Sequence, residues 1–276
     1  MNAILTVAAK ELRDGLRNRW LIAITVIFAL LSLGLAYFGA AASGRVGFTS
    51  LDTTIISLAS LAIFIVPLIA LLLAYHTGVG EEEQGTLLLL LTYPLGRGQL
   101  LAGKFLGHAG IIGIASLLGF GIAGVVMAVF SEETRLDELL GAYSYFILSV
   151  MMLGLVFVAF AHLISVLVAE KTRAAGLALL LWFLFVLIFD LVLLGMLVAT
   201  QGRLGADIFP YLLLLNPTDV FRLANLAGFE AAQAHTGLST IAAPEILSPA
   251  FLLGVLALWI AVPFALAAWL FSRRQA

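Results

Sequence analysis

Residues 53–75 read TTIISLASLAIFIVPLIALLLAY, an apolar run without a charged side chain. A helix needs about 20 apolar residues to cross a hydrocarbon core about 30 Å thick, so this run is long enough to span a bilayer. Five further runs are comparably long: 20–42, 105–130, 141–169, 174–200 and 248–271. Because backbone polar groups in lipid must be satisfied within helices, the sequence predicts an all-α polytopic membrane protein with six transmembrane helices.

The overall composition supports the same fold class. The chain is 63% hydrophobic and 11% charged over 276 residues, whereas soluble domains average about 45–50% and about 25%. The runs leave no stretch long enough for a separate soluble domain, so we expect 1–276 to form a single transmembrane domain. The absence of cysteine excludes disulfides and thiolate metal sites within the chain.

The distribution of lysine and arginine predicts the orientation. Ten of the 14 lie before the first run, after the second and fourth runs, and at the C-terminus. Such residues concentrate on the cytoplasmic side, so both termini are predicted to be cytoplasmic. The first apolar run is longer than the 7–15 residues of a signal-peptide core, which argues against cleavage.

Residues 1–19 have the pattern of an amphipathic helix. Leu5, Ala8, Leu12 and Leu16 recur at helical spacing, and Lys10, Arg13, Asp14 and Arg17 occupy the opposite face. Such a helix lies in the lipid headgroup layer. It can serve as an orientation signal, as an anchor, or as both.

The segment between the second and third runs, 76–104, is expected to face the cytoplasm. It contains EEEQGT at 81–86, five leucines at 87–91, TYPLGR at 92–97 and a lysine at 104. The leucine run is too short to span and is bracketed by turn residues, so we expect a short helix covered by the bilayer surface or by a protein groove. A solvated charge run explains the glutamates alone but not the whole pattern.

These residues resemble the coupling region of the type-2 ABC permease family, and residues 10–20 are similar to the elbow helix of that family. The resemblance covers nearly the whole chain. It implies an ABC transporter permease in the bacterial inner membrane, two copies of the chain, and a separate cytosolic ABC ATPase that supplies ATP and Mg. The residues implied to contact the ATPase are Glu81, Glu82, Glu83, Gly85, Thr86, Leu87, Pro94 and Arg97.

Within that family, residues 81–104 and 216–222 are similar to the membrane subunits of transporters that support maturation of nitrous oxide reductase. That similarity implies a periplasmic partner protein and a role in copper-site assembly and denitrification. The alternatives are an ABC exporter permease for another substrate and an autonomous secondary transporter. The latter predicts internal repeats and several buried ionisable residues at the midplane, which the sequence does not show.

Neither nucleotide nor metal is expected to bind this chain. It is predicted to be no enzyme and to have no catalytic residue, because the ATPase activity is expected in a separate subunit and the sequence lacks a Ser–His, Cys–His or HExxH constellation. Residues 98–104 fit GxxxxGK, but Phe105 stands where a Ser or Thr is needed. Copper(I) prefers soft sulfur ligands. Methionine and histidine pairs at three- or four-residue spacing are absent from the sequence, so core packing explains the methionines better. Membrane lipid is an expected partner, and nucleic acid is not.

Asp190 lies inside the fifth run, where a carboxylate costs about 2.5–3.5 kcal/mol at the bilayer centre. It has no nearby carboxylate or histidine in the sequence that would suggest a proton relay. A structural or cavity-lining role is therefore favoured over a transport role.

The segment 201–247 is the longest outer loop and contains a predicted helix. Asn216 suits the N-cap, Pro217 the first helical position, Asp219 the first turn and Gly228 the end. The helix is either a lid on the membrane surface or a docking platform. The resemblance favours docking, with Asn216, Pro217, Asp219, Phe221 and Arg222 against the periplasmic partner.

Glycines recur along the third run and its approach, at 103, 107, 110, 113, 119, 121 and 124. Small residues let helices approach closely in lipid. The pattern fits both tight packing and sliding between conformations.

Overall fold

The computed structural model describes residues 3–38, 50–83, 85, 95–130, 136–201, 208–227 and 248–273. Within these residues the chain is helical and contains no strand. The elements are α1 (Ala3–Arg17), α2 (Trp20–Phe38), α3 (Leu51–Ala74), α4 (Val79–Glu83), α6 (Arg97–Phe130), α7 (Leu136–Leu167), α8 (Lys171–Phe183), the π-helix η2 (Leu184–Ile188), α9 (Phe189–Ala199), α10 (Phe209–Leu213), α11 (Pro217–Ala227) and α14 (Pro249–Arg273).

Six helical segments of the described chain are long and apolar enough to cross a membrane, which confirms the predicted fold class. They are Trp20–Phe38, Thr53–Glu83, Arg97–Phe130, Leu139–Leu167, Lys171–Ala199 and Pro249–Arg273. The second ends later and the third begins earlier than the apolar runs predicted. The second span includes the turn at 75–78 and α4, and the third begins with α6 at Arg97, so both extend into segment 76–104.

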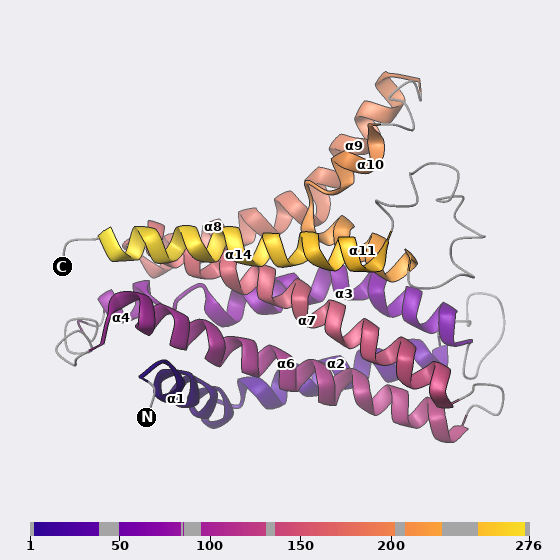
Figure 1. The fold of residues 1–276 in the computed structure, drawn as a ribbon, viewed down its shortest axis with the longest axis horizontal. Coiled ribbons are helices and arrows are strands. Elements are labelled where there is room, and N and C mark those ends of the chain that lie inside the picture. The colour runs from indigo at the N-terminus through magenta and orange to yellow at the C-terminus, as the bar shows by residue number, and fades with distance from the viewer. Residues whose placement is uncertain are drawn as a thin grey trace.

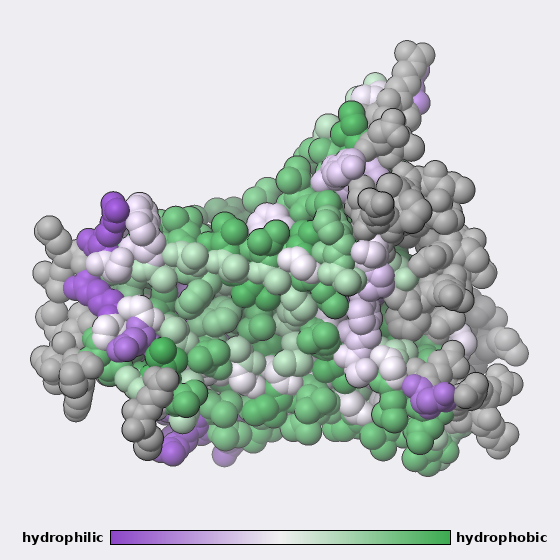
Figure 2. All heavy atoms as spheres, viewed as in Figure 1, coloured by the Kyte–Doolittle hydropathy of each residue, from purple (hydrophilic) through white to green (hydrophobic). Residues whose placement is uncertain are grey.

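The long helices lie side by side in one bundle, and both chain ends lie at the same end of it (Figure 1). We call this the N/C end and the opposite one the far end. Helix α6 packs against α1, α2 and α7, while α7 also packs against α3 and α14. Helices α9 and α10 lean away from the bundle (Figure 1). Apolar side chains dominate the surface between the two ends, and hydrophilic ones gather at the N/C end (Figure 2).

Aromatic side chains join three spans in the core. Phe28 of α2 stacks on Phe120 of α6 with ring centroids 4.8 Å apart. Phe120 meets Phe146 of α7 edge-to-face at 5.2 Å. Such pairs contribute about 0.5–1.5 kcal/mol beyond the burial of their area. They hold α2, α6 and α7 together near the middle of the bundle.

The glycines of α6 support the tight-packing interpretation. A Cβ at Gly119 would lie 2.4 Å from Cβ of Phe28 in α2. A Cβ at Gly107 would lie 2.4 Å from Cβ of Glu11 in α1. Both distances are far below van der Waals contact, so these positions set how closely α1 and α2 approach α6.

Candidate functional site

Helix α4 lies at the N/C end, directly before the segment that carries the leucine run. The turn that precedes it is fastened to α7, because the backbone N–H groups of Gly78 and Val79 both donate to Oγ of Ser165, at 2.7 and 3.0 Å. Thr77 closes the turn by donating from Oγ1 to the carbonyl of Ala74 at 2.7 Å. The start of α4 is therefore fixed to both α3 and α7.

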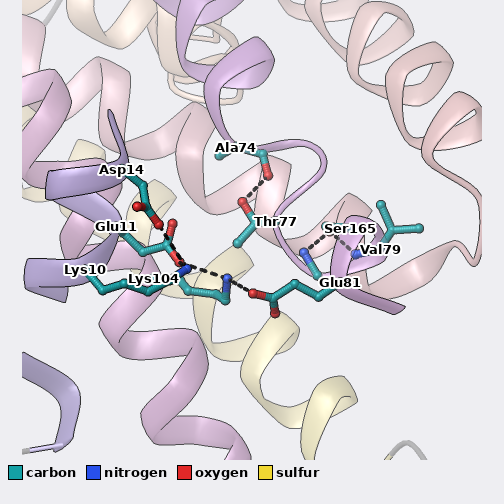
Figure 3. Close-up of polar contacts among 10 residues, drawn as sticks. Lys10, Glu11, Asp14, Ala74, Thr77, Val79, Glu81, Lys104 and Ser165 are labelled. Atoms are coloured by element: carbon teal, nitrogen blue, oxygen red, sulfur yellow. Dashed lines mark hydrogen bonds and ion pairs between the residues drawn. The ribbon is translucent and has the colours of Figure 1, made fainter. Parts of the chain in front are cut away.

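Lys104 of α6 connects α4 with α1. Its Nζ lies 2.7 Å from Oε1 of Glu81 in α4 and 3.0 Å from Oε1 of Glu11 in α1. Figure 3 shows the lysine between the two carboxylates. The Lys104 side chain is 6% exposed, so its charge depends on these partners rather than on water. We call Lys104, Glu11 and Glu81 the Lys104 junction.

The close approach of α1 to α6 makes this junction possible. Gly103 and Gly107 stand one helical turn apart on α6, and a Cβ at either would collide with Val7 or Glu11 of α1. Burial alone raises the pKa of Glu11, but the nearby ammonium groups of Lys104 and Lys10 outweigh it and lower the pKa to about 2. Glu11 is therefore charged at neutral pH and can hold Lys104.

The three glutamates of α4 point to different surroundings, since successive helical residues are about 100° apart. Glu81 joins the Lys104 junction. The Glu83 carboxylate accepts a 2.6 Å hydrogen bond from the backbone N–H of Lys171, at the first residue of α8. Carboxylates at a helix N-terminus are stabilising because they meet its unpaired N–H groups. Glu82 is exposed.

The other residues implied to contact an ATPase divide into two groups. Gly85, two residues after the end of α4, adopts φ +69°, a conformation that favours glycine. Arg97 begins α6, and its Nη1 lies 3.4 Å from the carbonyl oxygen of Phe271 in α14. Thr86, Leu87 and Pro94 lie outside the described residues. Contact between these side chains and an ATPase stays a prediction.

Histidines come together beside the junction in a way that spacing in the sequence did not indicate. The rings of His108 in α6 and His162 in α7 lie 5.4 Å apart, and both side chains are buried. His162 Nδ1 lies 2.9 Å from the Val158 carbonyl oxygen, so it is the protonated nitrogen. His162 also lines a small pocket with Lys104 and Ser165. Among the described residues no group of three or more potential metal ligands occurs.

Helix α11 forms a second polar cluster, closer to the far end. The predicted N-cap is present, because the backbone N–H of Thr218 donates to Oδ1 of Asn216 at 3.1 Å. Asn225 exchanges hydrogen bonds with Ser149 of α7. The predicted helix end at Gly228 falls outside the described residues.

The burial of α11 changes the picture of its predicted partner contacts. Asn216, Pro217, Asp219 and Phe221 are buried, and Phe221 has no exposed surface. The helix is not a lid on the membrane surface, because it packs against α3, α7 and α14 on several sides. Four of the five predicted contact residues therefore present no surface to a partner in this conformation. Arg222 remains 39% exposed.

Asp190 of α9 is ion-paired rather than isolated. Nη2 of Arg222 lies 3.0 Å from Oδ2 of Asp190, and Nη1 lies 2.8 Å from Oδ1 of Asp219. The pairing crosses from the fifth span to α11 and agrees with a structural role. The sequence pattern does not indicate this partner, because Arg222 follows Asp190 by 32 residues and lies in another element.

Comparisons with known proteins agree with this architecture. A family model described as "ABC-2 family transporter protein" matches residues 5–276. A protein of Pseudomonas aeruginosa, named "Probable ABC transporter permease protein NosY", is 57% identical over 274 residues and 99% of each chain. A protein of Stutzerimonas stutzeri with the same name is 54% identical over the same length and coverage. With six spans and a full-length family match, the chain belongs to the ABC-2 family of transporter permeases.

Proposed function

We propose that this permease couples ATP hydrolysis in a separate cytosolic ABC ATPase to movement of a periplasmic partner during maturation of nitrous oxide reductase. The similarity to two proteins named as probable NosY permeases supports this role. The complex would contain two copies of this chain, a NosF-like ATPase dimer and a NosD-like periplasmic protein. ATP and Mg would bind the ATPase and not this chain. The N/C end would face the cytoplasm of a bacterium, and the spans would lie in its inner membrane.

The arrangement around α4 is the observation that carries the proposal. Residues 84–96 lie between α4 and α6 in the chain and contain four of the eight implied ATPase contacts, while three others lie in α4 and Arg97 begins α6. From α4, direct hydrogen bonds and ion pairs lead to α6, α7 and α8, and Lys104 extends the connection to α1. A displacement of this loop by an ATPase would therefore act on four helices at once.

On the opposite side we propose that segment 201–247 contacts the periplasmic partner. Buried α11 would act by moving with α3, α7 and α14, against which it packs. Exposed side chains for direct contact are available on and beside α10, at Ile208, Tyr211 and Leu215. Arg222 is the one originally predicted contact residue of this segment whose side chain is substantially exposed.

The Lys104 junction tests the coupling role. Lys104→Met removes the cation between two largely buried carboxylates, and breaking such an ion pair costs about 3–5 kcal/mol. We expect loss of ATP turnover by the assembled complex and loss of reductase maturation in cells. Lys10→Met is the matched control, because Lys10 pairs with the same Glu11 but is 56% exposed, and it should leave both activities near the wild-type level.

A neutral triple variant separates coupling from folding. Lys104→Met with Glu11→Gln and Glu81→Gln leaves no unpaired charge, so the complex should assemble and remain monodisperse. ATP turnover in this complex should still fail to support reductase maturation. Normal maturation in the triple variant would contradict the role of the junction.

Normal ATP turnover after replacing 87–91 by a polar linker would contradict the proposed docking region.

A further inference from the structure

The fifth span departs from α-helical geometry in its middle. Between α8 and α9 the residues Leu184–Ile188 form a π-helical turn, in which the Phe189 N–H bonds to the Leu184 carbonyl five residues earlier. A π turn accommodates one more residue than an α turn, is rare, and occurs often at functional sites. Its carbonyls are offset from the regular ladder and are accessible to other donors.

Two side chains of the α11 N-terminus converge on one carbonyl of this turn. Asn216 donates from Nδ2 to the Phe185 oxygen at 2.9 Å, and Thr218 donates from Oγ1 to the same oxygen at 3.1 Å. The Thr218 Oγ1 also lies 2.8 Å from Oδ1 of Asn216, so its single proton is shared between these two acceptors. Both are buried, so water cannot replace a hydrogen-bond partner that either side chain loses.

A charged contact follows directly after the turn. Asp190 lies two residues past η2 and pairs with Arg222, which also holds Asp219. Asn216 donates a second hydrogen bond to Oδ2 of Asp219, at 2.9 Å, so the contacts to Phe185 and to Asp190 belong to one network. Loss of the extra residue of the π turn would rotate α9 by about 100° and remove Asp190 from Arg222.

We propose that Asn216 and Thr218 are positioning residues that stabilise the π-helical geometry of Leu184–Ile188 and thereby set the direction of α9. We call Asn216, Thr218, Asp219 and Arg222, with Phe185 and Asp190, the α11 latch. Because α11 is packed among α3, α7 and α14, the latch makes the projecting α9 and α10 follow the bundle. This consequence for transport rests on the proposed function, whereas the geometry of the fifth span does not.

The chain is suited to a direct measurement because it contains no cysteine. Spin labels on Val198→Cys at the end of α9 and Leu258→Cys on α14 occupy exposed positions on the two sides of the latch. The full-length double-cysteine chain would be co-expressed with an excess of the cysteine-free chain, so that each complex carries one copy that can be labelled. The purified complex would then be spin-labelled and placed in lipid nanodiscs. Electron–electron double resonance then reports the distance distribution between α9 and α14.

We expect one narrow distribution for the wild-type latch. Asn216→Ala with Thr218→Val should shift or broaden it by several ångströms. Thr218→Ser alone, which keeps the hydroxyl donor, should keep the native distribution. Ser149→Ala is the matched control, because it removes a buried hydrogen bond to α11 at Asn225 without touching the π turn. It should leave the distribution unchanged.

Two outcomes would overturn the latch. One is an unchanged distribution in the double variant, and the other is an equal shift in Ser149→Ala, which would indicate general loosening of α11. If the double variant fails to fold, Thr218→Val alone is measured against Ser149→Ala with the same criteria. A shifted distribution supports the latch whatever the ATP turnover of the complex, so its failure is separate from failure of the proposed coupling role.

Discussion

Lys104 combines three properties that suit it to connect helices. Its ammonium has three donors, it is almost completely buried, and its two carboxylate partners come from elements on either side of α6. A buried ion pair alone is weak evidence for stability, because desolvation offsets much of the attraction. Lys104 instead matters for helix placement, because this one side chain fixes the relative positions of α1, α4 and α6.

Asp219 and Asp190 share the guanidinium of Arg222, and this arrangement makes the stability of the fold depend on pH. Burial raises the pKa of Asp219 to about 7, and the negative charge of Asp190 adds to the effect, while Arg222 opposes it. The folded protein therefore binds a proton between the ordinary value of 3.8 and about 7 that the unfolded chain has lost. Stability falls as pH rises through this window.

We predict that Asp219→Asn removes this pH dependence. The unfolding temperature of the wild-type protein in detergent should decrease from pH 4 to pH 7, and that of the variant should decrease less, because the amide does not titrate. Differential scanning fluorimetry across the range measures both. Parallel curves for the two proteins would show that Asp219 does not carry a proton in the folded state.

At the scale of elements, α1 packs closely against Gly103 and Gly107 of α6, which we call the α1 seat. Gly103 and Gly107 leave space for the α1 backbone and for Glu11, so the helix is a packed part of the bundle as well as an amphipathic surface element. Leu5 and Leu16 of α1 remain exposed on another side and are available to lipid. The predicted place of α1 in the headgroup layer is compatible with both contacts.

We predict that Gly107→Ala displaces α1 and weakens the Lys104 junction. The added Cβ would lie 2.4 Å from Cβ of Glu11, close to the backbone, so rotamer changes alone cannot relieve the contact. Overpacking of this kind costs about 1–3 kcal/mol. The expected result is a lower unfolding temperature and reduced ATP turnover of the complex.

Gly121→Ala is the matched control for this variant. Gly121 lies on the same helix, and a Cβ there would meet no atom within 4 Å, so stability should stay the same or rise slightly. Equal effects of the two substitutions would show that helix propensity, rather than the α1 seat, governs the response.

For the whole molecule, the fifth span exposes much of its surface, in contrast to the second, third and fourth spans. The Asp190–Arg222 pair belongs to this exposed region, with both side chains more than a third exposed. Charged groups at span depth usually face protein or water rather than lipid. A second copy of the chain would provide such a surface, in agreement with the proposed pairing.

We predict that each complex contains two copies of this chain. Native mass spectrometry of the complex purified with its ATPase should give a mass with two permease chains. Co-expression of two differently tagged copies should allow either tag to purify the other. A single copy per complex would contradict the proposed architecture.

Features that depend on neighbouring residues could be predicted from the amino-acid sequence. The length of each apolar run predicted six spans, because the bilayer thickness and backbone hydrogen bonding admit few alternatives. The local chemistry of Asn216 and Pro217 predicted the start of α11, because an N-cap acts within one helical turn. The third apolar run predicted its span too short, because the helix continues past the apolar residues to Arg97.

Contacts between residues distant in the chain depend on how the helices pack. Glu11, Glu81 and Lys104 are far apart in the chain, and the pairing of His108 with His162 joins two spans. The burial of α11 was equally inaccessible, because amphipathic spacing shows that a face will be covered but not whether lipid, a partner or the bundle covers it. Helix packing brings together side chains whose separation in sequence carries no information about their distance. The Lys104 junction and the α11 latch both depend on this packing.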